Sequence, residues 1–374
     1  MAVTVYTTND PLAVKLWSKK LFVEALKQTW LAKFMGSTVD SLIQIKDEAT
    51  KGPGDKITYG LRMQLQGRGV QGDSTLEGNE EALSTYTDAL VIDQLRHAVR
   101  ANGRMSQQRV PYSLREEAMS GLRDWWADRI DFSGFNQLCG NVPAALIDTK
   151  YTGLQTPFNP DIAHYMNAAN APGPTGLLTP ANTDADVATT TYTAANATTQ
   201  NAVFTLGMID RAKERAKIAT PAIRPLKIKG KDFYVMFLHP TQVTDLRTNT
   251  QTGQWLDIQK AAMTGGEVTD NPIFDGSLGV YNGVILHEDV RVPNGNVGGV
   301  PVLNTRRAVF CGAQAAVIGY GRENGPEKFT WIEETFDYGN QFGVAAGLIW
   351  GMKKVQFNGM DFATITMTTF AATH

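Results

Sequence analysis

Large apolar side chains recur at helical spacing in two parts of this sequence. The first part begins near Pro11, which suits the first turn of a helix, and ends near Gly36. Lysines crowd its remaining surface, so the pattern predicts an amphipathic helix that serves as an arm. A membrane-surface anchor is a second interpretation, but packing on this chain or on a neighbouring copy is favoured. The apolar face holds Trp17, Phe22, Trp30 and Phe34.

The second helical pattern runs from Pro111 to Phe132 and predicts a long helix. The adjacent Trp125 and Trp126 place large rings on both sides of its apolar stripe. This arrangement indicates a helix that is covered on more than one side.

Alternating polar and apolar residues predict two strands within residues 55–103, the second running from Tyr86 to Val99. Between them, residues 66–84 are rich in glycine and acidic side chains and poor in apolar ones. A loop of this length is more often a functional extension than part of a compact domain. Because it cannot bury a core of its own, we expect it to lie on a neighbouring subunit.

The rest of the chain changes character twice. Residues 165–201 contain no Lys, Arg or Glu and consist mostly of small and polar residues, which is typical of a linker. Residues 202–321 alternate helical and strand patterns, as in a mixed α/β unit, with one strand expected over 308–320. Residues 328–370 are strand-rich, and the alternation at 363–368 predicts a half-buried strand. We therefore expect 202–321 to be an insertion in a discontinuous domain.

Composition and charge exclude several classes of protein. The chain has 374 residues of which 43% are hydrophobic, which is enough to build cores and excludes wholesale disorder. Its 35 basic and 37 acidic residues give a net charge of −2, which excludes binding of nucleic acid by bulk positive charge. Two cysteines are too few for a disulfide framework. Without a signal-like start or a long apolar run, we expect a soluble intracellular product.

The sequence contains only weak matches to motifs for catalysis and for the binding of cofactors, metals or nucleic acid. Residues 67–72 match the glycine spacing of a dinucleotide-binding loop, but acids and no apolar helical face follow, so a flexible loop tip is favoured. No histidine stands at ligand spacing from another histidine or a cysteine, and we expect no metal, no cofactor and no catalytic residues. Cys139 and Cys311 have apolar neighbours and are expected to be buried and unreactive. The basic run at 211–231 lacks interleaved aromatics, so solvent or a partner subunit is favoured over nucleic acid.

Four stretches share their character, order and spacing with one family of proteins. A glycine-punctuated turn leads into a strand at 273–288, and an apolar run follows at 308–316. A Gly-Pro-Gly-Asp hairpin at 52–55 follows the aromatic, basic first helix, and the glycine-rich ending spans 337–362. Together they resemble the major capsid proteins of tailed bacteriophages, in particular the podophage-type family also met in prophages. The similarity covers most of the chain except residues 165–201.

The resemblance implies the Hong Kong ninety-seven-type phage capsid fold, which is of the α+β class. This fold has an N-terminal arm, an extended β-hairpin loop, a peripheral domain with a long spine helix, and an inserted α/β axial domain. The elements expected from the residue pattern follow the same order. By this analogy the arm is 1–54, the extended loop 55–103, the peripheral domain 104–201 with 322–374, and the axial domain 202–321.

The resemblance also implies a structural protein and not an enzyme. Copies would form the hexamers and pentamers of an icosahedral shell that encloses the double-stranded DNA genome of a phage. The extended loop would lie over an adjacent subunit, and the first helix would clasp a neighbour. The residues expected at these subunit interfaces are Trp17, Phe22, Trp30, Phe34, Arg62, Arg68, Glu77, Glu80 and Glu81.

Further partners follow from the same resemblance. Many relatives carry a cleavable scaffolding region before the arm, whereas here the arm begins at once, so a separate scaffolding protein is expected. A portal, decoration proteins and non-specific contact with packaged DNA are also expected, without a membrane. The protein would reside in the virion capsid after assembly in the host bacterial cytoplasm. Two alternatives stay open, an encapsulin-like compartment shell that binds a cargo peptide, and a soluble α/β enzyme that uses residues 67–72 or the basic run.

Overall fold

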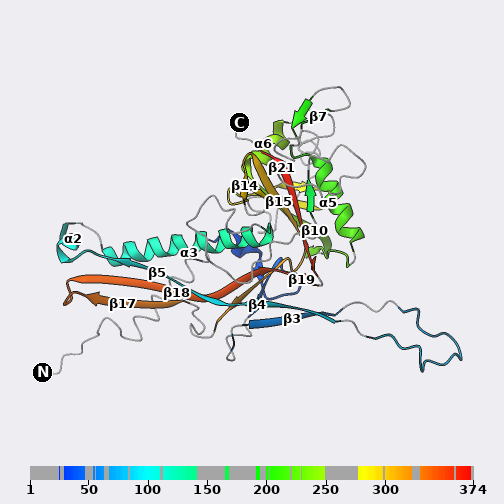
Figure 1. Cartoon of the computed structure of the whole chain (residues 1–374), viewed down its shortest axis with the longest axis horizontal. Coiled ribbons are helices and arrows are strands. Elements are labelled where there is room, and N and C mark those ends of the chain that lie inside the picture. The colour runs from blue at the N-terminus through cyan, green and yellow to red at the C-terminus, as the bar shows by residue number, and fades with distance from the viewer. Residues whose placement is uncertain are drawn as a thin grey trace.

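The computed structural model shows two β-sheets, a long helix lying along one of them, and a hairpin that projects away from the body (Figure 1). The structure describes residues 25, 29–46, 54, 56–62, 67–82, 85–109, 113–140, 165–167, 191–193, 199–201, 203–219, 221–228, 230–248, 277–297, 300–321, 329–357 and 359–371. Among the helices in these ranges, none has the length and apolar character needed to cross a membrane.

The first sheet has six strands, built around the 14-residue β18. In sheet order they are β1 (Met35–Gly36), β2 (Ile43–Lys46), β16 (Ala316–Tyr320), β18 (Gln341–Lys354) and β17 (Thr330–Phe336), with β5 (Asp93–Arg100) also paired to β18. β17, β5 and β16 all run antiparallel to β18, whereas β1 and β2 run parallel to their neighbours. The ends of β5, β17 and β18 therefore project together beyond the body (Figure 1).

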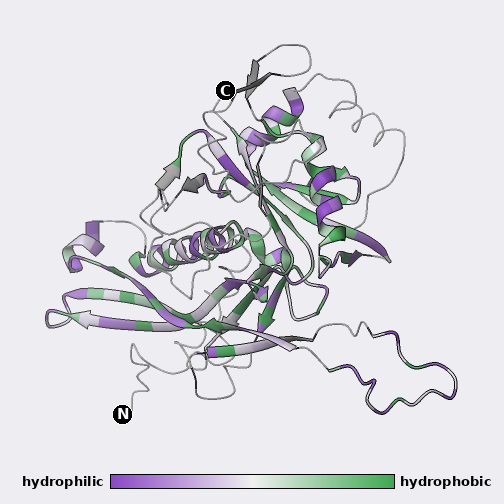
Figure 2. Ribbon diagram, turned by 45° about the vertical axis from the view of Figure 1, so that its right-hand side comes forward, coloured by the Kyte–Doolittle hydropathy of each residue, from purple (hydrophilic) through white to green (hydrophobic). Residues whose placement is uncertain are grey.

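The second sheet has seven strands and holds much of the buried apolar core. In order they are β11 (Ser277–Tyr281), β12 (Val284–Glu288), β10 (Lys231–Leu238), β15 (Thr305–Cys311), β21 (Thr364–Phe370) and β6 (Tyr165–Asn167), with β9 (Leu226–Ile228) paired to β10. Figure 2 shows hydrophobic residues gathered along its central strands. The helices α5 (Leu206–Ile218) and α6 (Pro240–Thr248) belong to the same part of the molecule (Figure 1).

Four two-stranded hairpins and three further helical segments complete the described fold. The hairpins are β3 (Lys56–Arg62) with β4 (Thr85–Val91), β7 (Thr191–Thr193) with β8 (Thr199–Asn201), β13 (Gly295–Val297) with β14 (Val300–Val302), and β19 (Gln356–Phe357) with β20 (Met360–Asp361). The helices are the 3-10 segment η1 (Trp30–Phe34), α2 (Arg104–Arg109) and α3 (Leu114–Leu138).

The long helix predicted from Pro111 is α3, which continues six residues beyond the expected end at Phe132. Two acids in its first turn complement the positive end of the helix dipole, and Gly140, with φ of 62°, follows its C-cap. Trp126 is fully buried and packs edge-on against Phe329, at a centroid distance of 5.0 Å. Trp125 stacks on His97 of β5 at 4.4 Å. The helix is thus covered on two sides, as its paired tryptophans predicted.

Three expected elements differ in the structure. The second strand of the projecting hairpin divides at Ile92 into β4 and β5, and these two strands join different sheets. The strand expected over 308–320 is likewise two strands, because the chain turns after Gly312, where a Cβ would lie 2.4 Å from the Arg224 carbonyl oxygen. β21 is buried on both faces, not one, since its threonines are enclosed as fully as the alternate Ile365 and Met367.

The two sheets divide the chain differently from the expected boundaries. β16 lies before the expected boundary at 321 but pairs with β18 in the six-stranded sheet. β21 and β6, both expected in the peripheral domain, complete the seven-stranded sheet instead. Both differences arise because strands that are distant in sequence pair with each other. The periodicity of hydrophobic residues along the chain does not encode such pairing. Most of the N-terminal helix expected before Gly36 lies outside the described residues, and the described end is the 3-10 segment η1 followed by β1.

Candidate assembly interface

The loop between β3 and β4 extends far from the body of the subunit (Figure 1). Residues 67–82 contain no helix or strand, and all but Val70 are exposed. Gly69, Gly72 and Gly78 have positive φ of 67°, 63° and 87°, which glycine adopts without strain. Because no helix follows residues 67–72, this glycine motif has no helix N-terminus with which to hold a phosphate.

Internal hydrogen bonds shape this loop. The Gly67 N–H donates to Glu81 Oε2 at 2.5 Å, and the Gly78 N–H donates to Glu80 Oε2 at 2.7 Å. The Asn79 N–H donates to the Leu76 carbonyl at 2.9 Å, and Leu76 itself is 61% exposed. With Arg68 as its one base against four acids, residues 67–82 carry a formal charge of −3. The loop therefore offers an apolar side chain within an acidic surface.

The base of the hairpin is fixed to the six-stranded sheet by close packing. Ile57 of β3 and Leu90 of β4 are buried against Gly319 of β16. A Cβ at Gly319 would lie 2.6 Å from Ile57 Cδ1 and 2.8 Å from Leu90 Cδ2. The absence of a side chain at this glycine lets the hairpin sit directly on the sheet.

A buried polar cluster around Asp88 of β4 adds to this attachment. Lys353 Nζ lies 2.5 Å from Asp88 Oδ1, and the Tyr59 hydroxyl donates to Asp88 Oδ2 at 2.8 Å. The Gln356 N–H donates to the same Oδ2 at 3.2 Å. Burial, followed by the nearby Asp88 carboxylate, raises the pKa of Tyr59 far above its usual value, so the phenol stays a donor. The loop is thus carried on a rigid base.

The opposite end of the molecule is the projecting sheet of β5, β17 and β18 (Figure 1). Trp331 and Glu333 of β17 are buried, whereas the alternate Ile332, Glu334 and Phe336 are exposed. Alternate residues of a strand lie on opposite faces, so one face of this sheet is open.

Two arginines of β5 lie on the open face. The Arg100 guanidinium stacks over the Phe336 ring at 4.3 Å, and the stem of Arg96 crosses the backbone at Gly347. Both residues are exposed. The projecting sheet therefore combines positive charge with the exposed apolar side chains of Ile332 and Phe336.

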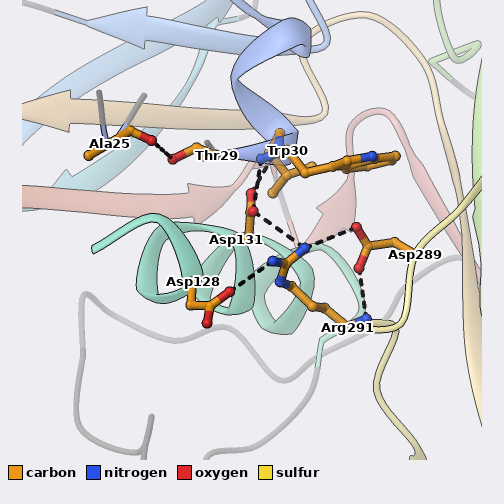
Figure 3. Close-up of polar contacts among 8 residues, drawn as sticks. Ala25, Thr29, Trp30, Asp128, Asp131, Asp289 and Arg291 are labelled. Atoms are coloured by element: carbon orange, nitrogen blue, oxygen red, sulfur yellow. Dashed lines mark hydrogen bonds and ion pairs between the residues drawn. The ribbon is translucent and has the colours of Figure 1, made fainter. Parts of the chain in front are cut away.

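A charged junction joins three distant parts of the chain (Figure 3). Asp131 of α3 accepts hydrogen bonds from the backbone N–H groups of Trp30 at 2.8 Å and Leu31 at 2.9 Å, and so caps η1. Arg291 Nη2 lies 2.8 Å from Asp128 Oδ1, and its Nη1 lies 3.5 Å from Asp131 Oδ2. Burial raises the pKa of Asp131 to about 6, although the two N–H donors and Arg291 oppose this shift.

Both cysteines and one of two adjacent acids are enclosed within the subunit. Cys139 and Cys311 are both buried, as expected, and this burial raises the pKa of the Cys139 thiol to about 12 and that of Cys311 well above its usual value. Glu333 is buried against Arg115 Nη2 at 2.6 Å, whereas Glu334 is exposed, so these adjacent acids face opposite ways. Within the described ranges, no three His, Cys, Asp or Glu side chains gather as metal ligands do.

The residues predicted at subunit interfaces lie in three settings. Trp17 and Phe22 lie outside the described residues, and Arg62 ends β3 with its side chain outside the described part. Phe34 is buried and Trp30 half-buried, and both rings contact Phe237 of the subunit's own core, at 5.2 and 5.4 Å. Because Phe34 is buried within the subunit, only the exposed part of Trp30 is available to a neighbouring copy. An interface role for these two residues stays a prediction. The remaining four, Arg68, Glu77, Glu80 and Glu81, are exposed on the extended loop.

Sequence reasoning missed the residues on the projecting sheet. The alternation of Ile332, Glu334 and Phe336 with buried positions was a usable signal for an open strand face. The stacking of Arg100 on Phe336 could not be predicted from the sequence, because it depends on the pairing of β5 and β17 with opposite edges of β18.

Comparison with known proteins agrees with this geometry. The sequence family described as phage capsid protein matches residues 5–373 of this chain. The chain belongs to the phage capsid protein family. A major capsid protein of Pseudomonas phage KPP25 is 29% identical over 389 aligned positions, which cover 96% of this chain and 95% of that protein.

Solved phage capsids share the fold over almost the whole chain. The capsid of Ralstonia phage GP4 has a TM-score of 0.73 at 32% identity and covers 100% of this chain and 99% of its own. The capsid of cyanophage Pam1 has a TM-score of 0.67 at 18% identity, over 93% and 94% of the two chains. The α+β phage capsid fold expected from the sequence is therefore confirmed. The names of its domains remain predictions.

Proposed function

We propose that this chain is the major capsid protein of a tailed bacteriophage and that its copies build an icosahedral shell from hexamers and pentamers. The observation that carries the proposal is the match to phage capsid proteins, which spans residues 5–373 in the family comparison and the whole chain in the structural one. The shell would enclose double-stranded DNA without a sequence-specific site, which suits a chain of net charge −2. A scaffolding protein, a portal and decoration proteins are the further partners of this proposal.

Assembly would use the two ends of the subunit. The acidic loop 67–82 and the basic, apolar face of β5 and β17 lie at opposite ends of the longest axis, so a loop cannot reach the face of its own subunit (Figure 1). A contact between different surfaces of two copies closes into a ring when the rotation is right. In such a ring, Glu77 would approach Arg96 and Arg100, and Leu76 would pack near Phe336 of the next copy.

Deletion of residues 67–80 tests this mechanism. We expect the variant to retain the helix and strand content and the cooperative unfolding of the normal subunit, because the deleted segment is exposed and the hairpin base at Ile57 and Leu90 is untouched. Rings and shells should be lost or strongly reduced, as seen by negative-stain microscopy and sedimentation velocity. Particles in normal yield from this variant would contradict the role given to the loop.

A further inference from the structure

Basic side chains are concentrated in one short part of the chain. Residues 206–231, which span α5, β9 and the turn into β10, hold eight Lys and Arg residues against two acids, a formal charge of +6. The whole chain has a net charge of −2. The rest of the chain therefore carries an excess of acids, and positive charge is a local property of this segment.

The fold brings the elements of this segment together beside the seven-stranded sheet. The Ile223 N–H, just before β9, donates to the Ala216 carbonyl of α5 at 2.9 Å. At the turn between β11 and β12, a Cβ on Gly283 would lie 3.4 Å from both Lys213 Nζ and the Asp232 carbonyl oxygen. α5 and the β9–β10 hairpin thus form one surface, on the side of the sheet away from α3 (Figure 1). We call it the basic surface.

Apolar and basic positions separate on α5. Its buried residues are Leu206, Met208, Ile209, Ala212 and Ala216, which pack toward the core. Arg211, Lys213 and Arg215 are half-buried, and Lys217 is exposed. Outside the helix, Arg224, Lys227 and Lys231 are also exposed. The basic surface therefore presents its charges to solvent in the isolated subunit.

This arrangement costs repulsion energy in the isolated subunit. Burial, and then the charge of Lys217 one helical turn away, lower the pKa of Lys213, although Asp210 opposes the shift. Bases in the last turn of α5 complement the helix dipole, but the dipole does not account for Lys227 and Lys231 on the neighbouring hairpin. A partner of opposite charge would remove this repulsion.

The basic surface lacks the composition of a protein interface. Residues 206–231 contain no Phe, Tyr or Trp. Among the described residues of this segment, Ile218 is the only exposed large apolar side chain. The centres of protein interfaces are aromatic and apolar and are depleted of charge, whereas Lys and Arg are the usual contacts of a phosphate backbone. The composition therefore favours a phosphate polyanion over a protein.

The same composition favours a duplex over a single strand. Proteins that hold single strands stack the bases on aromatic side chains, which residues 206–231 do not contain. A duplex keeps its bases stacked inside and offers its phosphates to lysine and arginine without any such stacking. The 13 residues of α5 extend for about 20 Å, which is enough to follow several phosphates.

We propose that the basic surface faces the interior of the shell and contacts the phosphates of packaged double-stranded DNA without reading its sequence. The inference rests on the proposed function and names the part of the subunit that meets the DNA. A few phosphate contacts per subunit bind weakly at physiological salt, so the DNA could still move and leave the shell. The acidic excess elsewhere in the chain would confine the DNA contact to this surface.

Binding of a short duplex of random sequence to unassembled subunits tests the partner. The triple variant Lys217→Gln, Lys227→Gln and Lys231→Gln changes three exposed side chains, so we expect its helix and strand content to be unchanged. Its affinity at low salt, measured by fluorescence anisotropy, should fall at least about tenfold. The slope of log affinity against log salt should decrease by about 3, because each lysine on a phosphate contributes about one.

A second triple variant controls for total charge. Lys56→Gln, Arg104→Gln and Arg109→Gln remove the same charge from exposed positions outside the basic surface and should leave duplex binding nearly unchanged. Equal losses in the two variants, or no loss in the first, would overturn the proposal. Tighter binding of a single-stranded oligonucleotide or of polyglutamate than of the duplex would also overturn it, because the basic surface would then fit another partner.

The variant Lys217→Cys tests the interior position in assembled shells, since the two natural cysteines are buried. A small maleimide that enters the shell should label residue 217 in closed shells. A maleimide joined to a long polyethylene glycol should label it only in unassembled subunits. Labelling of closed shells by the large reagent would place the basic surface outside, and labelling by neither reagent would place it between copies. Either result would overturn the proposal.

The two experiments also separate this inference from the proposed function. Failure of the unchanged protein to form shells would overturn the proposed function and the interior position together. Normal shells whose subunits bind the duplex through another surface would overturn only the inference drawn here.

Discussion

His239 illustrates how a single side chain links pH to the stability of this subunit. It precedes α6, and its Nδ1 accepts a hydrogen bond from the Thr241 N–H at 3.2 Å, in the manner of an N-cap residue. Burial, and then the nearby Arg306, lower its pKa to about 4. The folded state therefore holds His239 neutral, with Nδ1 as an acceptor, between about pH 4 and the unfolded value of about 6.5.

The first prediction concerns acidification of unassembled subunits. Because the unfolded state binds the His239 proton first, this residue contributes full stability above about pH 6.5 and loses it as the pH falls toward 4. The loss amounts to at most about 3 kcal/mol. His239→Asn keeps an acceptor for Thr241 without the titration. Its free energy of unfolding, measured with denaturant at pH 4.5 and pH 7, should change less than that of the unchanged protein.

Asp131 provides an internal comparison because it acts in the opposite direction. Its pKa is raised to about 6, so the folded state binds its proton first and the contribution to stability falls as the pH rises from about 4 to 6. Removing His239 should therefore uncover this opposite slope. An unchanged pH profile in His239→Asn would show that other groups dominate the acid response. Neither shift could be predicted from the sequence, because both depend on burial by distant elements.

At the scale of elements, the attachment of the projecting hairpin depends on a glycine. We predict that Gly319→Ala destabilises the subunit by about 1–3 kcal/mol, because the new Cβ overlaps Ile57 and Leu90 and forces the hairpin base away from β16. Hydrogen exchange should quicken in β3 and β4 more than in α3. Thermal unfolding and exchange mass spectrometry measure the two effects.

Gly121 offers the matched control for this prediction. It lies on the exposed face of α3, and a Cβ there would have no neighbour within 4 Å. Gly121→Ala should therefore stabilise the subunit by about 0.5–1 kcal/mol, as expected for a helix interior. Equal effects of the two alanine substitutions would contradict the close packing inferred at Gly319.

Elements could be predicted from the sequence where one face of a segment is buried. The spacing that ends at Ile130 places α3, because this pattern reflects one regular element. The same reasoning fails for residues 308–320, since β15 and β16 are both buried on two faces and the hydrophobic pattern does not mark the turn between them. The division of the chain between two sheets is set by long-range pairing that local patterns do not contain.

At the scale of the whole molecule, the candidate interface was predictable only in part. The extended loop is visible in the sequence because a long polar stretch interrupts two strands, and its acids Glu77, Glu80 and Glu81 are exposed as an interface would need. The surface proposed to receive them is assembled from β5 and the β17–β18 hairpin, which are far apart in sequence. Phe34, by contrast, has an apolar pattern that fits an interface equally well, yet the subunit buries it in its own core.

The final prediction tests whether opposite charges at the two ends hold neighbouring subunits together. We expect Asp73→Lys with Glu77→Lys to abolish rings at low salt, because the reversed loop would then repel Arg96 and Arg100 of the next copy. Adding Arg96→Glu and Arg100→Glu to the same chain should restore part of the assembly, since each contact again joins opposite charges. The yield of rings, measured by sedimentation velocity, reports both steps. Glu214→Lys, which reverses the charge of an exposed acid on α5, should assemble normally and controls for a charge reversal outside the loop. Failure of the fourfold variant to recover, while each variant folds, would show that the loop binds another surface of the neighbouring subunit.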